Sequence, residues 1–438
     1  MRVAIIGGGT AGYLAAAQFS RFFPDLDLVH IFDSRIAPIG VGEGTLPGFK
    51  RGLDLITGAP FGQLAELCHA TIKEGVRFEG WGAASGCFHH YFTGDQRAYH
   101  LSAARLPGLL APHIRATHLD KHVERLHSTG RQVSIRFGDG TRMDCEFAID
   151  ARGFPRAFGD GQILLHGIPT NAAIVARGPV VSGLEETRAV TRPHGWVFVI
   201  PLASRTSYGY VYNAQVSEEG EIRSDLARFL QEEGVPDPQE GRKLSFPSFV
   251  QRRFFDGALF RIGNAASFLE PLEATAIGIT LEELRVASLW LADGFPGAAG
   301  ENRWEPGFLD LINGHLRRTV QAVALFVSWH YACGSEYDTQ FWRFARENFR
   351  RAASGSEDAT LLAEFGRCVR AGGALPVAHL ARLRDAGYYE ETIKPMLGLA
   401  GEIGGFGVPS FAQVGRGIGA YEDPEVGWEQ IFPNGEGK

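Results

Sequence analysis

The chain has 438 residues, of which 45% are hydrophobic and 21% are charged, as in an ordinary globular enzyme. Its formal net charge of −7 argues against nucleic acid or an anionic membrane surface as a partner. The five cysteines are widely spaced and form no Cys-x-x-Cys pair, which indicates reduced thiols in a cytoplasmic protein and no metal site. The N-terminal apolar run is only a strand long, so we expect no signal peptide.

The chain opens on a short apolar strand that runs into a glycine turn and then a helix of small residues. Gly7 permits the tight turn, Gly9 lets the backbone approach a pyrophosphate, and Gly12 lets the helix pack on the strand. The next strand ends on Asp33, 21 residues after Gly12, where a carboxylate can accept a hydrogen bond from a ribose hydroxyl. This order of elements predicts a dinucleotide site built from Gly7, Gly9, Thr10, Ala11, Gly12 and Asp33.

Two later glycine segments narrow the cofactor to a flavin. A glycine-dense strap at residues 40–45 would pass close to an isoalloxazine ring or a pyrophosphate. A second apolar strand meets a glycine turn at Gly263, the pattern that closes over the ribityl chain and the phosphates in FAD oxygenases. The residues expected to bind FAD in these segments are Gly40, Val41, Gly42, Glu43, Gly263, Asn264, Thr275, Ala276 and Ile277.

The pattern along the rest of the chain predicts the α/β fold class. Strands at 132–137 and 143–149 are expected to form a hairpin, and residues 165–255 are expected to be mostly β. Helical periodicity starts near residue 281 and continues through 309–330, 339–353 and 358–370. We expect a Rossmann-type FAD-binding domain with an interleaved β-rich part and a helical C-terminal part. The predicted boundaries are 1–164 and 256–330 for the FAD-binding domain, 165–255 for the β-rich substrate-facing part and 331–438 for the C-terminal substrate or lid part.

Further motifs carry a resemblance to a known family. Lys73 stands five residues before Phe78 and eight before Trp81, and Glu273 stands in the segment Pro-Leu-Glu-Ala-Thr. With the glycine opening and strap, and with segments 195–201, 329–331 and 341–342, these motifs resemble the flavin-dependent tryptophan halogenase family. The resemblance implies that Lys73 and Glu273 are catalytic and that Trp81, Trp196 and Phe198 line or gate the substrate site. Trp196 and Phe198 are equally compatible with a purely packing role in the core.

Other polar residues are less specific. Glu270 is a rival carboxylate that could instead cap the following helix. Arg77 and Arg152 are weaker candidates for contacts with flavin or substrate. Four histidines without metal-ligand spacing are expected to be structural or to line the substrate site, namely His89, His90, His100 and His330.

The chain also departs from the family's motifs. Phe198 replaces a tryptophan, Asn264 replaces an aspartate, and Ala274 and Ala276 replace the serine and glycine beside the family's threonine. Gly44 stands where alanine is usual, and the region between Trp81 and Asp150 is compact. These departures favour a smaller branch of the superfamily, the flavoprotein monooxygenases that hydroxylate a tryptophan in a partner polypeptide during cysteine tryptophylquinone biogenesis.

The chemistry implied by the resemblance uses reduced FAD and dioxygen, which form a flavin C4a-hydroperoxide that the indole ring attacks. Lys73 would bind the transferred oxygen and Glu273 would take the proton from the indole. A flavin reductase or another reductant source is the expected second partner. The alternative is a halogenase of free indole, tryptophan or phenolic substrates, in which the same two residues act. A non-catalytic flavin-binding module is the rival from a different functional class.

Overall fold

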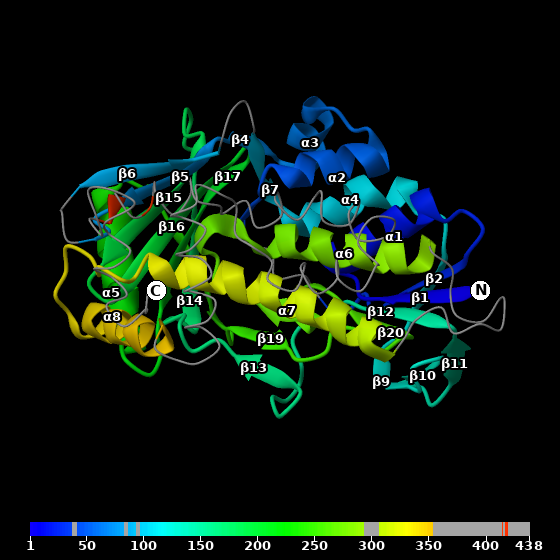
Figure 1. Ribbon diagram of the computed structural model, residues 1–438. Helices are drawn as coiled ribbons and strands as arrows, with labels where there is room; N and C mark the ends of the chain where they lie inside the picture. Colours follow the sequence, from blue (N-terminus) through cyan, green and yellow to red (C-terminus); the bar gives the residue numbers. More distant parts are fainter. Residues whose placement is uncertain are drawn as a thin grey trace, which may run out of the picture.

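The computed structural model describes residues 1–36, 42–82, 86–92, 97–292 and 306–353, together with Val414, Gly417 and Ile418. Figure 1 shows two β-sheet regions with helices α6 (Ala276–Ala292) and α7 (Pro306–Trp329) running side by side across the middle. The expected FAD-binding residues Gly40 and Val41 and the expected helix over 358–370 lie outside the described residues.

A five-stranded parallel sheet forms the Rossmann-like core in the order β20-β12-β1-β2-β8. Its strands are β1 (Arg2–Ile6), β2 (Asp27–Phe32), β8 (Thr117–Asp120), β12 (Phe147–Asp150) and β20 (Leu259–Arg261). Residues 3–6 of β1 and 147–149 of β12 are continuous apolar runs because both faces of a parallel sheet are covered. Helix α1 (Thr10–Phe22) covers one face with the buried residues Leu14, Ala15 and Ala17.

The other face of this sheet packs on a three-stranded antiparallel sheet of β9 (Val123–Ser128), β10 (Val133–Phe137) and β11 (Arg142–Cys145). The expected hairpin is present, since β10 and β11 pair antiparallel from Val133–Cys145 to Arg136–Arg142, but its second strand ends at Cys145 because residues 147–150 join a different sheet. The chain leaves β11 at Glu146, whose N–H donates to the carbonyl of Arg2, and then joins β1 as β12. In residues 142–145 the exposed Arg142 and Asp144 alternate with Met143 and Cys145, which suits a half-exposed sheet, whereas residues 147–149 are all apolar and buried.

A seven-stranded sheet forms the β-rich region in the order β18-β14-β17-β16-β15-β5-β6. Its strands are β5 (Gly75–Glu79), β6 (Cys87–Tyr91), β14 (Ala172–Gly178), β15 (Glu186–Arg192), β16 (Gly195–Leu202), β17 (Arg205–Tyr212) and β18 (Gln239–Ser245). Helix α5 (Glu219–Glu232), which the sequence-based prediction missed, packs on one face through Ile222, Leu226 and Phe229. These apolar residues recur at helical rather than strand spacing, so the signal was present in the sequence. The opposite face of the sheet is therefore free to line the cavity described below.

Smaller elements connect the two large sheets. Strands β3 (Gly42–Gly44), β4 (Thr71–Lys73) and β7 (Ala98–Ser102) form one small sheet, and β13 (Gln162–Leu164), β19 (Phe249–Gln251) and β21 (Ser267–Phe268) form another. Helices α2 (Gly48–Thr57), α3 (Phe61–Cys68) and α4 (Leu106–Leu110) lie together above α1 in Figure 1. Helices α7 and α8 (Gln340–Ala353) occupy the two helical stretches predicted at 309–330 and 339–353.

The mixed α/β fold class predicted from the sequence is confirmed, with the Rossmann-like parallel sheet and the helices that follow it. Residues 2–150 and 259–261 contribute strands to the parallel sheet. Five strands of the seven-stranded sheet, β14 to β18, lie between these segments in the chain, whereas β5 and β6 come from within residues 2–150. Whether these parts fold as separate domains with the predicted boundaries stays a prediction.

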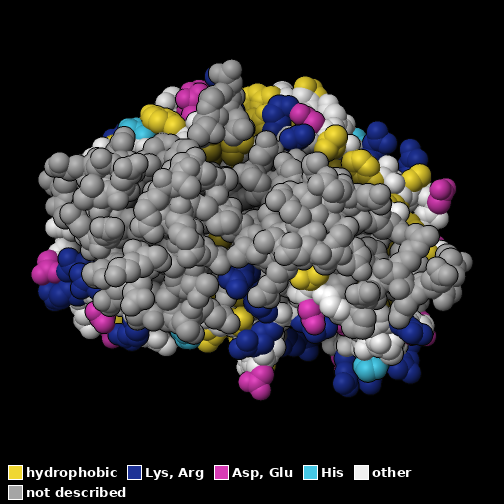
Figure 2. All heavy atoms as spheres, viewed as in Figure 1, with side chains coloured by type: hydrophobic (Ala, Val, Ile, Leu, Met, Phe, Trp, Pro, Cys, Tyr) yellow, Lys and Arg dark blue, Asp and Glu magenta, His cyan; other side chains and the backbone are white. Residues whose placement is uncertain are grey.

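The described surface is mixed in charge. On the face shown in Figure 2, lysine and arginine side chains along the rim alternate with acidic ones. Exposed ion pairs such as Arg253–Asp310 and Arg343–Asp338 are part of this mixture. In the described part of the chain, no helix combines the length and the apolar character that crossing a bilayer requires.

Candidate active site

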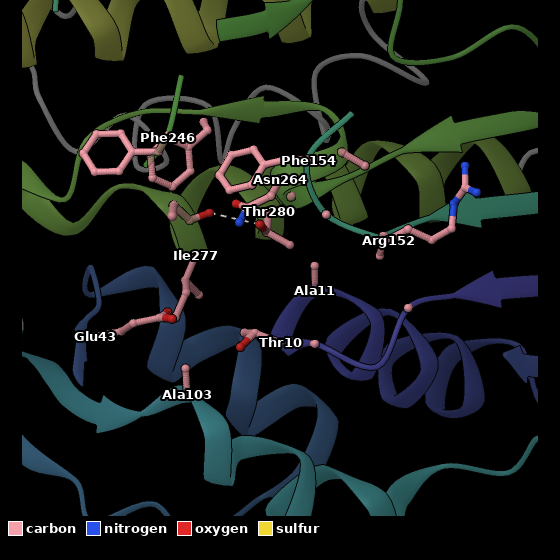
Figure 3. Close-up of a pocket in the computed structure, with 18 of the residues that line it drawn as sticks. Thr10, Ala11, Glu43, Ala103, Arg152, Phe154, Phe246, Asn264, Ile277 and Thr280 are labelled. Atoms are coloured by element: carbon pink, nitrogen blue, oxygen red, sulfur yellow. Dashed lines mark hydrogen bonds between the residues drawn. The ribbon is translucent and has the colours of Figure 1, made fainter. Parts of the chain in front are cut away.

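A cavity of about 940 Å³ is lined by both the Rossmann sheet and the seven-stranded sheet. At the Rossmann sheet it is bordered by Gly7, Gly9 and Asp33, and at the other sheet by Trp196 and Phe198. Figure 3 shows Thr10, Ala11 and Glu43 on one side of the cavity and Asn264, Ile277 and Phe246 on the other. Segments that are far apart in the sequence therefore line the same cavity from opposite sides.

The glycine turn after β1 has the geometry of a phosphate cradle. A Cβ at Gly7, where φ is +144°, would lie 2.3 Å from the Ala151 carbonyl oxygen, and a Cβ at Gly12 would lie 2.0 Å from the Gly7 carbonyl oxygen. Gly9 precedes α1 in an extended conformation, and no side chain caps the helix there. The amide groups of the first turn are thus left for a ligand, and a helix N-terminus favours an anionic one. The residues at this turn fit a dinucleotide pyrophosphate.

We expect Gly9→Ala to weaken FAD binding without unfolding the protein. A Cβ at Gly9 meets no protein atom within 4 Å but points into space on the cavity wall, where the pyrophosphate would approach. The expected result is a loss of FAD affinity of about tenfold or more at an unchanged melting temperature of the apoprotein. Isothermal titration with FAD measures it, and Gly48→Ala, also with no atom within 4 Å, is the matched control. Equal FAD affinity of the two variants would contradict the assignment.

Asp33 lies at the end of β2 on the cavity wall. Its carboxylate accepts hydrogen bonds from Arg35 Nε and Nη2, both at 2.8 Å, and contacts His122 Nδ1 at 3.2 Å. The hydrogen bonds from Arg35 hold the pKa of Asp33 well below its usual range, so the group is a carboxylate at neutral pH. A ribose hydroxyl would add one more donor to this carboxylate. The sequence reasoning missed Arg35 and His122, although Arg35 stands only two residues away.

Lys73 ends β4 and is completely buried on the cavity wall. Its ammonium donates a hydrogen bond to the Thr45 carbonyl oxygen at 3.3 Å and lies 5.3 Å from the centre of the Phe92 ring. Burial lowers the pKa of Lys73 to about 8, and the negative charge of Glu273 partly opposes this shift. The group is therefore protonated at neutral pH but close to its titration range.

The strap β3 runs against Lys73, and this contact explains Gly44. A Cβ at Gly44 would lie 3.3 Å from Lys73 Nζ and 3.0 Å from the Cβ of Ala274. Ala274 has a φ of +57° in the left-handed region. Gly44 therefore leaves room for the close approach of both Lys73 and the turn that carries Glu273.

Glu273 lies in the turn before α6 with a φ of +64°, a backbone conformation that costs a non-glycine residue about 1–3 kcal/mol. His90 Nδ1 at 2.8 Å and His330 Nε2 at 3.0 Å both contact its Oε1 atom. The other oxygen, Oε2, is buried and has no hydrogen-bond partner among the residues that the structure describes. Burial acts to raise the pKa of Glu273, but the charge of His90 and the hydrogen bonds from His330 and His90 outweigh it and hold the pKa well below normal. The structure thus brings an ionised carboxylate and a buried ammonium to one cavity.

Glu270 is a second buried carboxyl group on the cavity wall, three residues upstream. It accepts a hydrogen bond from the Tyr331 hydroxyl at 2.7 Å and another from the hydroxyl of Thr170. Tyr331 in turn accepts a hydrogen bond from Trp196 Nε1 at 2.8 Å. The hydrogen-bond partners of Glu270 in the structure are thus Thr170 and Tyr331, rather than the amide groups of the following helix. Burial raises the pKa of Glu270 to about 7, so its protonation differs from that of Glu273.

We expect Glu270→Gln to flatten the dependence of stability on pH. The pKa of Glu270 is about 7 in the folded state. Between about pH 5 and pH 7 the folded protein therefore keeps this carboxyl group protonated, whereas the unfolded chain releases the proton. As the pH rises over this range, the free energy of unfolding of the wild type should therefore fall, and the contribution of Glu270 to this fall is on the order of 3 kcal/mol. Urea denaturation at the two pH values measures the fall in both proteins. Identical falls in wild type and variant would contradict the shifted pKa.

The other predicted residues divide between cavity and core. Trp196, Phe198 and Arg152 line the cavity, whereas Trp81 is buried beside Trp196 and donates its Nε1 hydrogen to the Ala189 carbonyl oxygen at 2.9 Å. The structure thus does not bring Trp81 to the cavity. Among the flavin-binding residues predicted after residue 39, those that line the cavity are Gly42, Glu43, Gly263, Asn264, Thr275, Ala276 and Ile277.

Several of these residues have partners that the sequence did not reveal. The Gly263 N–H donates to Glu283 Oε2 at 2.6 Å. Glu43 differs in its protonation, because burial raises its pKa to about 7. The Thr275 hydroxyl is buried on the cavity wall without a hydrogen-bond partner. An unpaired buried hydroxyl at this position fits a polar ligand in the cavity.

The remaining candidates lie away from the cavity wall. His89 pairs with Glu186 at 2.6 Å, and Arg77 contacts Cys87 Sγ at 3.2 Å. His100 is buried between the hydroxyls of Thr71 and Thr187, at 3.1 and 2.9 Å. His90 and His330 instead contact Glu273, a role that only the tertiary structure reveals.

The comparison with known proteins identifies the family. Residues 2–102 and 95–375 match the sequence profile of the tryptophan halogenases. The chain belongs to this family. It is 23% identical over 473 residues to the tryptophan 7-halogenase RebH from Lentzea aerocolonigenes, covering 89% of this chain and 86% of RebH. It is 24% identical over 428 residues to the tryptophan 6-halogenase ThaL from Streptomyces albogriseolus, covering 79% and 78% of the two chains.

Solved halogenase structures share the fold. The tryptophan halogenase from Shewanella frigidimarina superposes with a TM-score of 0.73 at 19% identity, covering 99% of this chain and 93% of that one. The tryptophan 6-halogenase SttH from Streptomyces toxytricini superposes with a TM-score of 0.71 at 19% identity, covering 83% and 84%. The membership indicates that the protein is a flavin-dependent enzyme.

These comparisons overturn the preference for hydroxylation of tryptophan in a partner polypeptide. The similar proteins are named tryptophan 6- and 7-halogenases, and none of the findings points to cysteine tryptophylquinone biogenesis. The sequence interpretation gave too much weight to single motif departures. In the structure, Gly44 and Ala274 pack against each other and leave Lys73 and Glu273 in one cavity.

Proposed function

We propose that this protein is an FAD-dependent halogenase that attaches chloride or bromide to an electron-rich aromatic ring, with free indole or tryptophan as the first substrates to test and phenols as the second. The observation that carries the proposal is that Lys73 and Glu273 line the same cavity as the dinucleotide cradle. Family membership supports the same chemistry.

The residues present suit the cofactor. Gly7 and Gly9 would receive the pyrophosphate and Asp33 a ribose hydroxyl, while Glu43, Asn264 and Thr275 would line the flavin end of the cavity. When bound, reduced FAD would react with dioxygen to supply the oxidant that converts halide to a hypohalous species. A separate flavin reductase is the proposed source of reduced FAD.

The side chains around the cavity would carry out the remaining tasks. The buried Lys73 ammonium would hold the electrophilic halogen species by hydrogen bonding and by charge, which is strong in a site shielded from water. Glu273 would accept the proton that the ring loses, because it lines the cavity, is ionised and has one oxygen without a hydrogen-bond partner among the described residues. Trp196, Phe198 and Ile200 would pack on the aromatic substrate.

The test is incubation of the protein with FAD, a flavin reductase, reduced nicotinamide, oxygen and either chloride or bromide. Indole, tryptophan, phenol and a tryptophan-containing peptide are offered separately, and the products are analysed by mass spectrometry. The expected result is a halogen isotope pattern on at least one free aromatic compound. Addition of oxygen without halide dependence, or no product with any substrate although FAD binds, would contradict the proposal. Halogenation of the peptide alone would move the substrate class from free molecules to polypeptides.

A further inference from the structure

Two histidines from distant parts of the chain meet on a single carboxylate oxygen. His90 comes from β6, His330 directly follows α7, and both contact Oε1 of Glu273, at 2.8 and 3.0 Å. The three residues are buried, with exposed fractions of 3%, 0% and 2% in the order His90, His330 and Glu273. One carboxylate oxygen is thus held from two sides while Oε2 has no hydrogen-bond partner.

The number of protons on His330 can be worked out from its contacts. Its Nδ1 atom lies 2.9 Å from the carbonyl oxygen of Phe326, which can only accept, so Nδ1 carries a hydrogen. The contact between Nε2 and Glu273 Oε1 needs a second hydrogen. That hydrogen belongs either to Nε2, which makes an imidazolium beside a carboxylate, or to Glu273, which makes a neutral pair.

The surroundings favour the charged arrangement. Lys73 and His90 face Glu273 together with His330, and Glu270 contacts Tyr331 and Thr170 instead. Aromatic rings enclose His330, with the ring centres of Phe78 and Phe326 each 4.9 Å from its own. A buried carboxylate is stable only when it is paired and hydrogen-bonded, and both histidine contacts of Glu273 fall on Oε1.

We propose that His330 is an imidazolium that, with His90 as second donor, fixes Oε1 of an ionised Glu273 and directs Oε2 to the substrate as the proton acceptor. The inference rests on the proposed halogenation. In that reaction the carbon–halogen bond forms as the halogen–oxygen bond of the hypohalous acid breaks, and the hydroxide takes a proton from the Lys73 ammonium and leaves as water. The ring then loses its proton to Oε2, and the electron pair of the broken C–H bond restores aromaticity. Glu273 becomes neutral while His330 keeps both ring protons. His330 and His90 are thus positioning residues and Glu273 is the catalytic one.

The protonation state is tested without any turnover. The full chain is labelled with ¹⁵N-histidine, and the ring signals of His330 are assigned by their loss in His330→Gln. We expect both ring nitrogens to be of the protonated type at about pH 7.5, one full pH unit above the ordinary histidine value. In Glu273→Gln we expect a neutral ring with one protonated nitrogen. A neutral ring in the wild type would overturn the proposal, because the proton would then lie on Glu273.

The positioning role is tested by the pH profile of halogenation. The amide of His330→Gln can still donate to Oε1 but carries no charge, so the pKa of Glu273 should rise and the acid limb of kcat/KM should move to higher pH. We expect kcat/KM of the variant to be about tenfold or more below that of the wild type at pH 6, and to lie within about twofold of it near pH 8. A merely structural role would lower the rate equally at every pH and would overturn the proposal.

A matched control lies on the same helix. His315 of α7 is buried and contacts Glu282 Oε1 at 2.9 Å, so His315→Gln removes a similar pair away from Glu273. This variant should leave the acid limb in place. If the wild type makes no halogenated product, the proposed function fails, whereas the nitrogen signals of His330 still decide the protonation state.

Discussion

Lys73→Met is expected to reduce halogenated product by about 10²–10³-fold or more while FAD still binds. Methionine nearly fills the space of the lysine stem but removes the only hydrogen-bond donor of this buried side chain and its positive charge. A preorganised donor in a site shielded from water contributes this magnitude to a rate. Product is measured by mass spectrometry, and FAD binding by the absorbance of the purified holoprotein.

The control for this variant is Lys50→Met, because Lys50 is exposed on α2 and pairs only with Asp54 on the same helix. It should halogenate like the wild type. The pKa of Lys73, about 8, also predicts that wild-type activity falls as the pH rises through this value, since the ammonium then loses its proton. Undiminished halogenation by Lys73→Met would contradict the assigned role.

Glu273→Gln is expected to lower halogenation by about 10²–10⁴-fold, the range for loss of a general base. Glutamine keeps the shape and can still accept from His90 Nδ1, but it cannot take the ring proton. The readout is the rate of product formation at saturating FAD and halide.

Glu270→Gln gives the matched comparison for Glu273. Glu270 is largely protonated below its pKa of about 7, and the glutamine amide can hydrogen-bond Tyr331 and Thr170 as the neutral acid does. Its activity should stay within about threefold of the wild type below pH 7. Equal losses in both variants would assign the base to the pair rather than to Glu273.

Much of the Rossmann-like core was predictable because its determinants are local. The glycines after β1 act within a few residues of each other, and Asp33 follows at a separation that one strand–helix–strand unit imposes. Lys73 and Glu273 were found for a different reason, since each stands in a short motif shared with a family. Their meeting across 200 residues of sequence could be inferred only through that resemblance.

Other features depend on contacts that no short segment contains. Residues 143–149 look like one strand, yet Glu146 divides them because Phe147–Asp150 is buried best beside β1. Trp81 matches a motif, but the packing of Trp196 and Tyr331 keeps it in the core. The preference for a hydroxylase came from departures at Phe198, Asn264, Ala274 and Ala276 and from the compact region after Trp81, each read singly. In space, one of these departures, Ala274, packs against Gly44.

The fold class and the glycine turn after β1 were thus predictable from the sequence, because they follow from local backbone geometry, and the two proposed catalytic side chains were found through short motifs. Only the tertiary structure decided how each carboxyl group is charged. His330 and Tyr331 are neighbours in the chain, yet one contacts Glu273 and the other Glu270. The pKa of one carboxyl falls and that of the other rises, because burial and the charge of the partner, not the residue type, set which protonation state is stable.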